Sequence, residues 1–186
     1  MALLLIVVIV VVLALLLAGT YNRLVGLRQR ANQAFADIDV QLQQRHDLIP
    51  NLVETVKGYA AHEKGTLEAV TNARAAASSA TTVEGKVQAE NVLTGALRQL
   101  FAVAEAYPDL KANANFLRLQ DELADIENKL AAARRFFNNT VSEFNAAIQQ
   151  FPAVLIAGAM GFAPRTFFDL GEDRAAASAA PQVKFT

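Results

Sequence analysis

His46 and Asp47 are the first residues whose types suggest chemistry, because a carboxylate beside an imidazole can orient it for proton transfer. Sequence neighbours, however, do not share one face of a helix. Asp47 is better interpreted as a cap or turn residue ahead of Leu48-Ile49-Pro50-Asn51. The pair therefore predicts a local backbone feature rather than a catalytic dyad.

The remaining histidine and acidic residues follow no catalytic or metal-binding pattern. His62-Glu63 lacks a second histidine four residues on, since Thr66 stands there, so the zinc-protease motif is missing. No Glu-x-x-His, phosphate-binding glycine loop or Gly-x-Ser-x-Gly occurs. With two His and no Cys, we expect no metal, no cofactor and no catalytic residue. The sequence therefore predicts a protein that is not an enzyme.

Composition predicts long helices and excludes one class of partner. The 186 residues include only 5 Pro and 9 Gly, and this shortage of helix breakers favours an all-α fold. The formal net charge is −1, so no general electrostatic attraction to nucleic acid is expected. Amphipathic helices are therefore the elements expected to position any functional residue.

The N-terminal segment is an unbroken apolar run from Ala2 to Ala18. Such a helix rises about 25 Å, and residues 1–21 together reach the roughly 30 Å of a bilayer core. A cleaved signal peptide is the alternative, but no Lys or Arg precedes the run. We predict a transmembrane anchor over residues 1–21, with the lipid bilayer as partner. The anchoring side chains are Leu3, Leu4, Leu5, Ile6, Val7, Val8, Ile9, Val10, Val11, Val12, Leu13, Ala14, Leu15, Leu16, Leu17 and Ala18.

Two cues disagree about the side of the membrane on which the body lies. Arg23, Arg28 and Arg30 follow the run, and the positive-inside rule then puts the N-terminus outside and the body in the cytoplasm. Residues 17–20, Leu-Ala-Gly-Thr, instead resemble a lipoprotein attachment box with Thr in place of Cys. We expect a single-pass protein of the bacterial inner membrane with a cytoplasmic body, and keep a periplasmic body as the alternative.

Residues 22–151 carry apolar stripes at the 3/4 spacing of amphipathic helices. The stripes predict helices over about 20–49, from Pro50 to Ala77, over about 84–106 and over 116–148. Pro50 is expected to break the first helix or to begin the second. The last stripe, from Phe116 to Ile148, exceeds four heptads and favours bundle or coiled-coil packing. We expect an antiparallel bundle of about four long helices, assembled into a homo-oligomer.

Residues 152–170 are apolar and aromatic but too short to cross a bilayer between Pro152 and Pro164. The sequence leaves open whether this segment packs on its own bundle, on the membrane or on a neighbouring subunit. The candidate interface side chains are Phe162, Arg165, Phe167 and Phe168. Residues 171–186 form an Ala-rich tail that we expect to be mobile.

Several short motifs follow one another along the chain. They are Tyr21-Asn22-Arg23-Leu24-Val25, residues 45–53 (Arg-His-Asp-Leu-Ile-Pro-Asn-Leu-Val), residues 107–113 (Tyr-Pro-Asp-Leu-Lys-Ala-Asn), residues 134–138 (Arg-Arg-Phe-Phe-Asn), Phe151-Pro152, and residues 161–165 (Gly-Phe-Ala-Pro-Arg). In sequence and in order, these motifs resemble those of the LemA family. Departures are Phe137, where the family often has Tyr, and an anchor in place of a lipobox. The resemblance implies a single-pass bacterial membrane protein with a long-helix bundle, but no reaction. Its members are often encoded beside a membrane metalloprotease, and one relative belongs to the machinery that builds magnetosomes.

Anchor, helical seams and resemblance together predict a membrane-anchored scaffold or adaptor that self-assembles or recruits partners. One alternative is a regulatory adaptor whose partner is a membrane protease or another envelope protein. Another is a membrane-remodelling protein.

Overall fold

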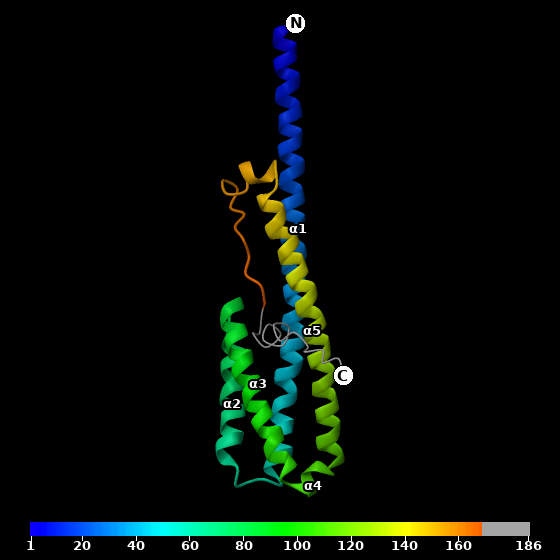
Figure 1. Cartoon of the computed structure of the whole chain (residues 1–186), viewed down its shortest axis with the longest axis vertical. Helices are drawn as coiled ribbons and strands as arrows, with labels where there is room; N and C mark the ends of the chain where they lie inside the picture. The colour runs from blue at the N-terminus through cyan, green and yellow to red at the C-terminus, as the bar shows by residue number, and fades with distance from the viewer. Residues whose placement is uncertain (169–186) are drawn as a thin grey trace, which may run out of the picture. The chain divides into compact units, whose positions relative to one another are not determined.

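The computed structural model describes residues 1–168, which form helices and connecting segments and no strand (Figure 1). The predicted all-α fold with an apolar N-terminal helix is therefore confirmed. The expected Ala-rich tail lies outside the described residues. The elements are α1 (Ala2–Lys57), α2 (Lys64–Ser79), α3 (Val83–Glu105), the short α4 (Pro108–Lys111), α5 (Ala114–Gln149) and a 3-10 turn, η1 (Ala153–Leu155).

The chain divides into two compact units, and the long helices α1 and α5 contribute to both. The first unit contains residues 1–39 and 132–167, and the second contains residues 40–131 and Phe168. Each unit has its own cluster of buried apolar side chains.

The first helix extends beyond its predicted end. We expected Pro50 to break it or to begin a new helix, and this expectation is wrong, because α1 continues through Pro50 to Lys57. The break comes at Gly58 instead, where the amides of Tyr59 and Ala60 both bond to the carbonyl of Val56. The predicted second helix is shortened accordingly and begins at Lys64.

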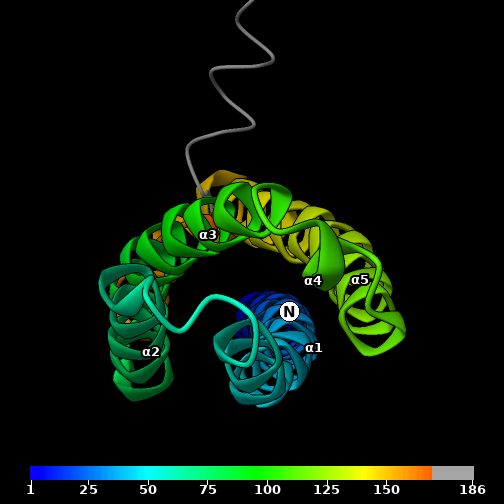
Figure 2. The same ribbon diagram turned by 90° about the horizontal axis from the view of Figure 1, so that it is seen from below.

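The second unit packs four helical segments around one apolar core. Viewed along the helices, α2, α3 and the first part of α5 form an arc that faces the last part of α1 (Figure 2). Helix starts are fixed by side chains, as when the Thr82 hydroxyl accepts from the Gly85 amide and the Asn113 side chain accepts from the Phe116 amide. The core includes Ile49, Leu52, Val56, Leu67, Val70, Leu93, Leu97, Leu100, Leu110, Phe116 and Leu119.

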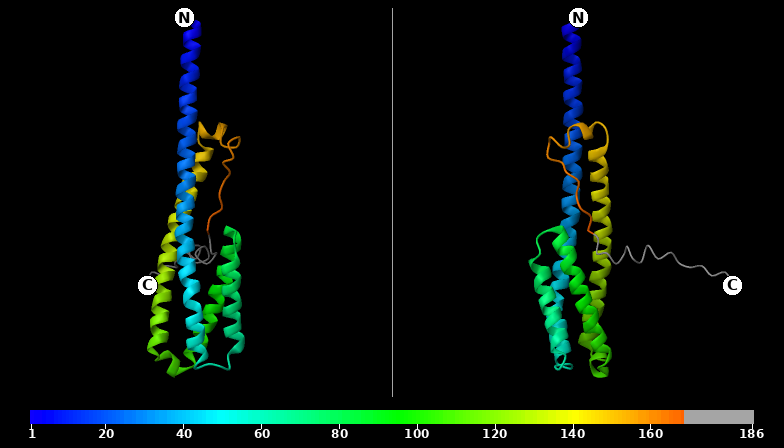
Figure 3. Two further views of the ribbon diagram at one scale, coloured as in Figure 1. Left: turned by 180° about the vertical axis from the view of Figure 1, so that it is seen from behind. Right: turned by 60° about the vertical axis from the view of Figure 1, so that its left-hand side comes forward.

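In the first unit, the second half of α5 lies beside α1, and the chain then turns back (Figure 3). The Phe35 and Phe137 rings meet with centroids 5.4 Å apart. The heptad seam predicted on α5 is confirmed, because its apolar positions are buried in one unit or the other, apart from the half-buried Ala133. The core of the first unit consists of Leu24, Leu27, Phe144, Ala147, Ile148, Ala153, Ala157 and Phe162.

Candidate functional site

The apolar run at the start of α1, from Ala2 to Ala18, is covered by no other part of the described chain. Its large side chains from Leu3 to Leu17 are each between 42% and 77% exposed. Within residues 1–168, α1 is the one helix long and apolar enough to cross a membrane, as judged by length and composition. All of the predicted anchor residues lie in this run.

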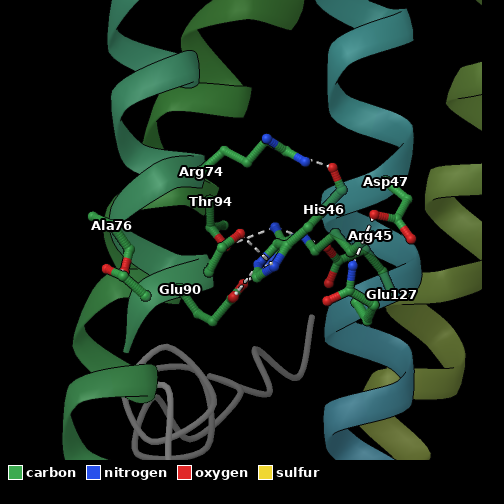
Figure 4. A network of polar contacts seen from close by, with 11 residues as sticks. Arg45, His46, Asp47, Arg74, Ala76, Glu90, Thr94 and Glu127 are labelled. Carbon is green, nitrogen blue, oxygen red and sulfur yellow. Dashed lines mark hydrogen bonds and ion pairs between the residues drawn. The ribbon is translucent and has the colours of Figure 1, made fainter. Parts of the chain in front are cut away.

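The second unit contains a buried charged cluster that the sequence reasoning did not predict. Arg45 and His46 on α1 and Glu90 on α3 are each at most 4% exposed. Arg45 Nη1 donates to Glu90 Oε2 at 2.8 Å, and His46 Nε2 lies 2.6 Å from Glu90 Oε1. Both oxygens of one carboxylate are therefore engaged by two neighbouring residues of α1 (Figure 4).

The cluster extends to the other two helices of the second unit. Arg45 Nη2 lies 2.8 Å from Glu127 Oε1 on α5 and donates to the Thr94 hydroxyl at 2.9 Å. His46 Nδ1 lies 3.1 Å from the hydroxyl of Ser78 on α2. One pair of side chains on α1 thus contacts α2, α3 and α5 through polar groups. We call Arg45, His46, Glu90, Thr94 and Glu127 the hub.

A backbone bond beside the hub explains why α1 continues through Pro50. Proline has no N–H, so it cannot donate to the carbonyl of residue 46, four positions earlier. Arg74 Nε on α2 donates to that carbonyl at 2.7 Å instead. A side chain from a neighbouring helix therefore replaces the missing helical hydrogen bond, and the helix tolerates its internal proline.

Hydrophobic periodicity contains a signal for the hub. The stripe of α1 runs through Leu42 and Ile49, and the positions between them on the buried face are Arg45 and His46. Glu90 likewise precedes Leu93 at the spacing of the α3 stripe. Charged residues at core positions of a heptad pattern indicate a buried pair.

Asp47 has a different role from the one predicted. We interpreted it as a cap or turn residue, which is wrong, because it lies inside α1. Its side chain is exposed and accepts a hydrogen bond from Gln43 one turn earlier, at 2.8 Å. As expected for sequence neighbours, Asp47 and His46 lie on different faces of the helix, since one is exposed and the other buried.

The hub borders a cavity of about 400 Å³ that is also lined by Leu97 and Phe101. Among residues 1–168, no group of three or more His, Cys, Asp or Glu side chains is placed to hold a metal ion. His62 is exposed, while Glu63 beside it accepts a hydrogen bond from the Tyr107 hydroxyl at 3.2 Å. Burial, followed by the bond and charge of Glu63, raises the pKa of Tyr107.

The first unit contains a second polar arrangement, a clamp that holds residue 165 against α1 and α5. The Asn145 side chain donates to the carbonyl of Arg165 at 2.9 Å and accepts from its amide at 2.8 Å. The Arg165 guanidinium reaches α1, where it donates to Asn32 Oδ1 at 2.6 Å and to the Arg28 carbonyl at 3.3 Å. Burial, and then the charge of Arg28, lower the pKa of Arg165.

The four candidate interface residues have different environments. Phe162 is buried, with its ring centroid 5.8 Å from that of Tyr21 and 5.1 Å from the Arg28 guanidinium carbon. Arg165 belongs to the clamp, Phe168 is buried, and Phe167 is exposed. Gly161, just before Phe162, has φ +73°, a conformation that glycine adopts at little cost.

The sequence model of the LemA family matches residues 34–185, which is most of the chain. This chain belongs to the LemA family. It is 28% identical over 138 residues to Protein LemA of Metamycoplasma hominis, covering 72% of this chain and 61% of the relative. It is 25% identical over 174 residues to Magnetosome protein MamQ of Magnetospirillum gryphiswaldense, covering 80% of this chain and 64% of the relative. The chain thus spans less than two thirds of each of these relatives.

The structure gives physical roles to the motifs through which the chain resembles LemA proteins. Residues 45–53 supply Arg45 and His46 of the hub, the internal Pro50 and two core residues. In residues 107–113, Leu110 is buried in the core and Asn113 caps α5. Residues 161–165 supply the glycine turn and the clamp. In this LemA-family chain, these three motifs therefore supply packing contacts and hydrogen bonds that hold neighbouring segments together.

Removing Glu90 should destabilise the second unit strongly. Glu90→Ala leaves His46 and half of the Arg45 guanidinium buried without their partner, so we expect a loss of about 3–5 kcal/mol in unfolding free energy. The measurement is urea unfolding of the full-length protein in mild detergent, followed by circular dichroism. The control is Glu54→Ala, because the Glu54 pair with Lys57 is exposed and should matter by less than about 1 kcal/mol. Equal losses in the two variants would contradict a structural role for the hub.

Arg74 and Pro50 should be energetically coupled. Arg74→Met keeps the apolar stem but removes the donor to the His46 carbonyl, which should cost about 1.5–3 kcal/mol. In a Pro50→Ala background, the restored amide of residue 50 can donate instead, so the same change should cost less. A double-mutant cycle on unfolding free energy measures this difference. An identical cost in both backgrounds would show that the Arg74 bond does not replace the proline's missing one.

Proposed function

We propose that this LemA-family protein is a membrane-anchored helical scaffold or adaptor without catalytic activity. The observation that carries the proposal is the uncovered apolar run of α1, which continues without a break into the part of the same helix that bears Arg45 and His46. One helix therefore serves both as the anchor and as a structural member of the folded part.

Solvation argues for a lipid environment around the start of α1. Each exposed Val, Leu or Ile side chain forgoes about 1.5–3 kcal/mol that burial would gain, and these side chains follow one another from Leu3 to Leu13. No polar face interrupts the run, so another soluble protein would have to surround the helix on all sides. A bilayer does so without specific contacts.

The packed helices support the scaffold role. The polar contacts described above specify how the helices within each unit lie against one another. A scaffold needs such defined packing to present a fixed surface to its partners. Exposed large apolar side chains lie on these helices, among them Val92, Leu117 and Phe136. They are candidate contacts to a second copy or to a different protein. The relative named as a magnetosome protein supports a role within a larger cellular structure.

We further propose that the membrane is the bacterial inner membrane and that the body lies in the cytoplasm. Arg23, Arg28 and Arg30 follow the apolar run, and residues 1–36 contain no acidic side chain. Such clusters beside a membrane helix favour the cytoplasmic side.

Mass measurement tests the scaffold role. The full-length protein in lipid nanodiscs should have a discrete multiple of the 20.0 kDa chain mass by mass photometry with the disc mass subtracted. A clean monomer would contradict self-assembly. It would favour the second candidate, an adaptor that acts as a monomer on a membrane protease or another envelope protein, and co-purification would then identify the partner.

Cysteine labelling tests the orientation, because the native chain has no Cys. In spheroplasts, a membrane-impermeant maleimide should label an Ala2→Cys variant at once. An Ala76→Cys variant, at an exposed position of α2, should react only after permeabilisation. The reverse pattern would place the body outside the cytoplasm.

A further inference from the structure

Large apolar side chains gather on the outside of the turn that follows α5. Phe151 is 81% exposed and Leu155 is 71% exposed, and Val154 and Met160 are also exposed. A turn at a water-facing surface ordinarily carries polar residues. Exposed apolar patches of this kind mark interaction sites.

The opposite side of the same turn is firmly packed. Ala153, Ala157 and Phe162 are buried in the core of the first unit. The Phe162 amide donates to the Ala157 carbonyl at 2.9 Å and closes the turn. Ala153 and Ala157 therefore face the core while Phe151, Val154 and Leu155 face outward, so packing of this turn within its own unit does not account for Phe151 and Leu155.

The turn is fixed at a definite level of α1. Phe162 contacts Tyr21 and Arg28, and Arg165 bonds to Asn32. Tyr21 lies three residues beyond Ala18, the end of the apolar run, and Ala2–Thr20 rises about 28 Å, close to the roughly 30 Å of a bilayer core. Two views show the turn beside α1 just past its apolar run (Figures 1 and 3). The exposed apolar side chains thus lie where α1 would leave the bilayer.

Charge around the turn suits a lipid surface. Residues 1–36 and 144–168 contain no Asp or Glu. Arg23 is exposed beside the turn's contact residue Tyr21. Cationic and aromatic side chains at the end of a membrane helix are typical of the headgroup region.

We propose that the turn formed by residues 151–160 inserts Phe151, Val154 and Leu155 into the interfacial layer of the same membrane that α1 crosses. This inference rests on the proposed membrane anchoring. The chain then has two membrane contacts, a spanning helix and a shallow apolar turn, and the second fixes the depth and tilt of the first unit in the bilayer. The turn and the spanning helix form one membrane-binding element, because the inner side of the turn is packed against α1.

Single-cysteine spin labelling of the full-length protein tests the proposal, since no native Cys competes. The labelled variants are Leu155→Cys in the turn, Val10→Cys in the apolar run of α1, and Gln33→Cys. Gln33 is exposed on α1 and lies about 18 Å further along the helix than Tyr21. Each is placed in nanodiscs of phosphatidylcholine and phosphatidylglycerol. Power saturation with oxygen reports lipid access, and a water-soluble nickel chelate reports water access.

We expect oxygen to relax the labels at positions 10 and 155 several-fold more than the nickel chelate does, with the opposite preference at position 33. A label at 155 that resembles the one at 33, or that is shielded from both reagents as in a protein interface, would overturn the inference while position 10 still reports the anchor. A water-exposed label at position 10 would instead overturn the proposed anchoring itself. A Phe151→Cys label repeats the test, and circular dichroism confirms that each variant keeps its helices.

Discussion

A carboxylate buried among apolar side chains has to be paired, and Glu90 is paired by two residues that arrive together on one helix. Because Arg45 and His46 are neighbours on α1, the bond from each to Glu90 fixes both the height and the rotation of α1 against α3. Apolar seams alone permit a helix to slide by a turn, since one leucine fits much like another. The hub removes that freedom, because any shift would leave charges buried without partners.

Arg74, beside the hub, also joins two helices through a polar contact. By supplying the bond that Pro50 cannot make, Arg74 ties α2 to the backbone of α1, while Ser78 contacts the imidazole one turn further along α2. The first unit uses a different device for the same purpose. There, the Asn145 amide mimics a backbone partner for Arg165, and the guanidinium of Arg165 continues to α1. Both units therefore join helices through polar groups of a few specific residues, and apolar contacts fill the space between.

The sequence was sufficient for the features that depend on periodicity. The seam of α5, the extent of α3 and the apolar start of α1 follow from spacing and length, which short-range physics determines.

The course of α1 through Pro50 could not be predicted, because the bond that permits it comes from Arg74 on another helix. The hub was missed for a related reason. Glu90 lies 45 positions from Arg45 in the chain, and no local rule pairs residues at that separation. The outward face of residues 151–160 was also hidden, because composition alone marks the whole segment as apolar without showing that Ala153 and Ala157 face inward.

The unbroken course of α1 from its apolar run to Asn32 has a consequence for rotational phase within the first unit. An α-helix turns about 100° per residue, so the apolar side chains of residues 2–18 have a fixed angular relation to Tyr21 and Asn32, which contact Phe162 and Arg165. Inserting one residue near Gly19 would leave hydrophobicity and length almost unchanged, yet it would rotate the apolar run by that angle relative to the turn that follows α5. The number of residues between the run and Tyr21 therefore determines which face of the run lies on the same side of α1 as that turn.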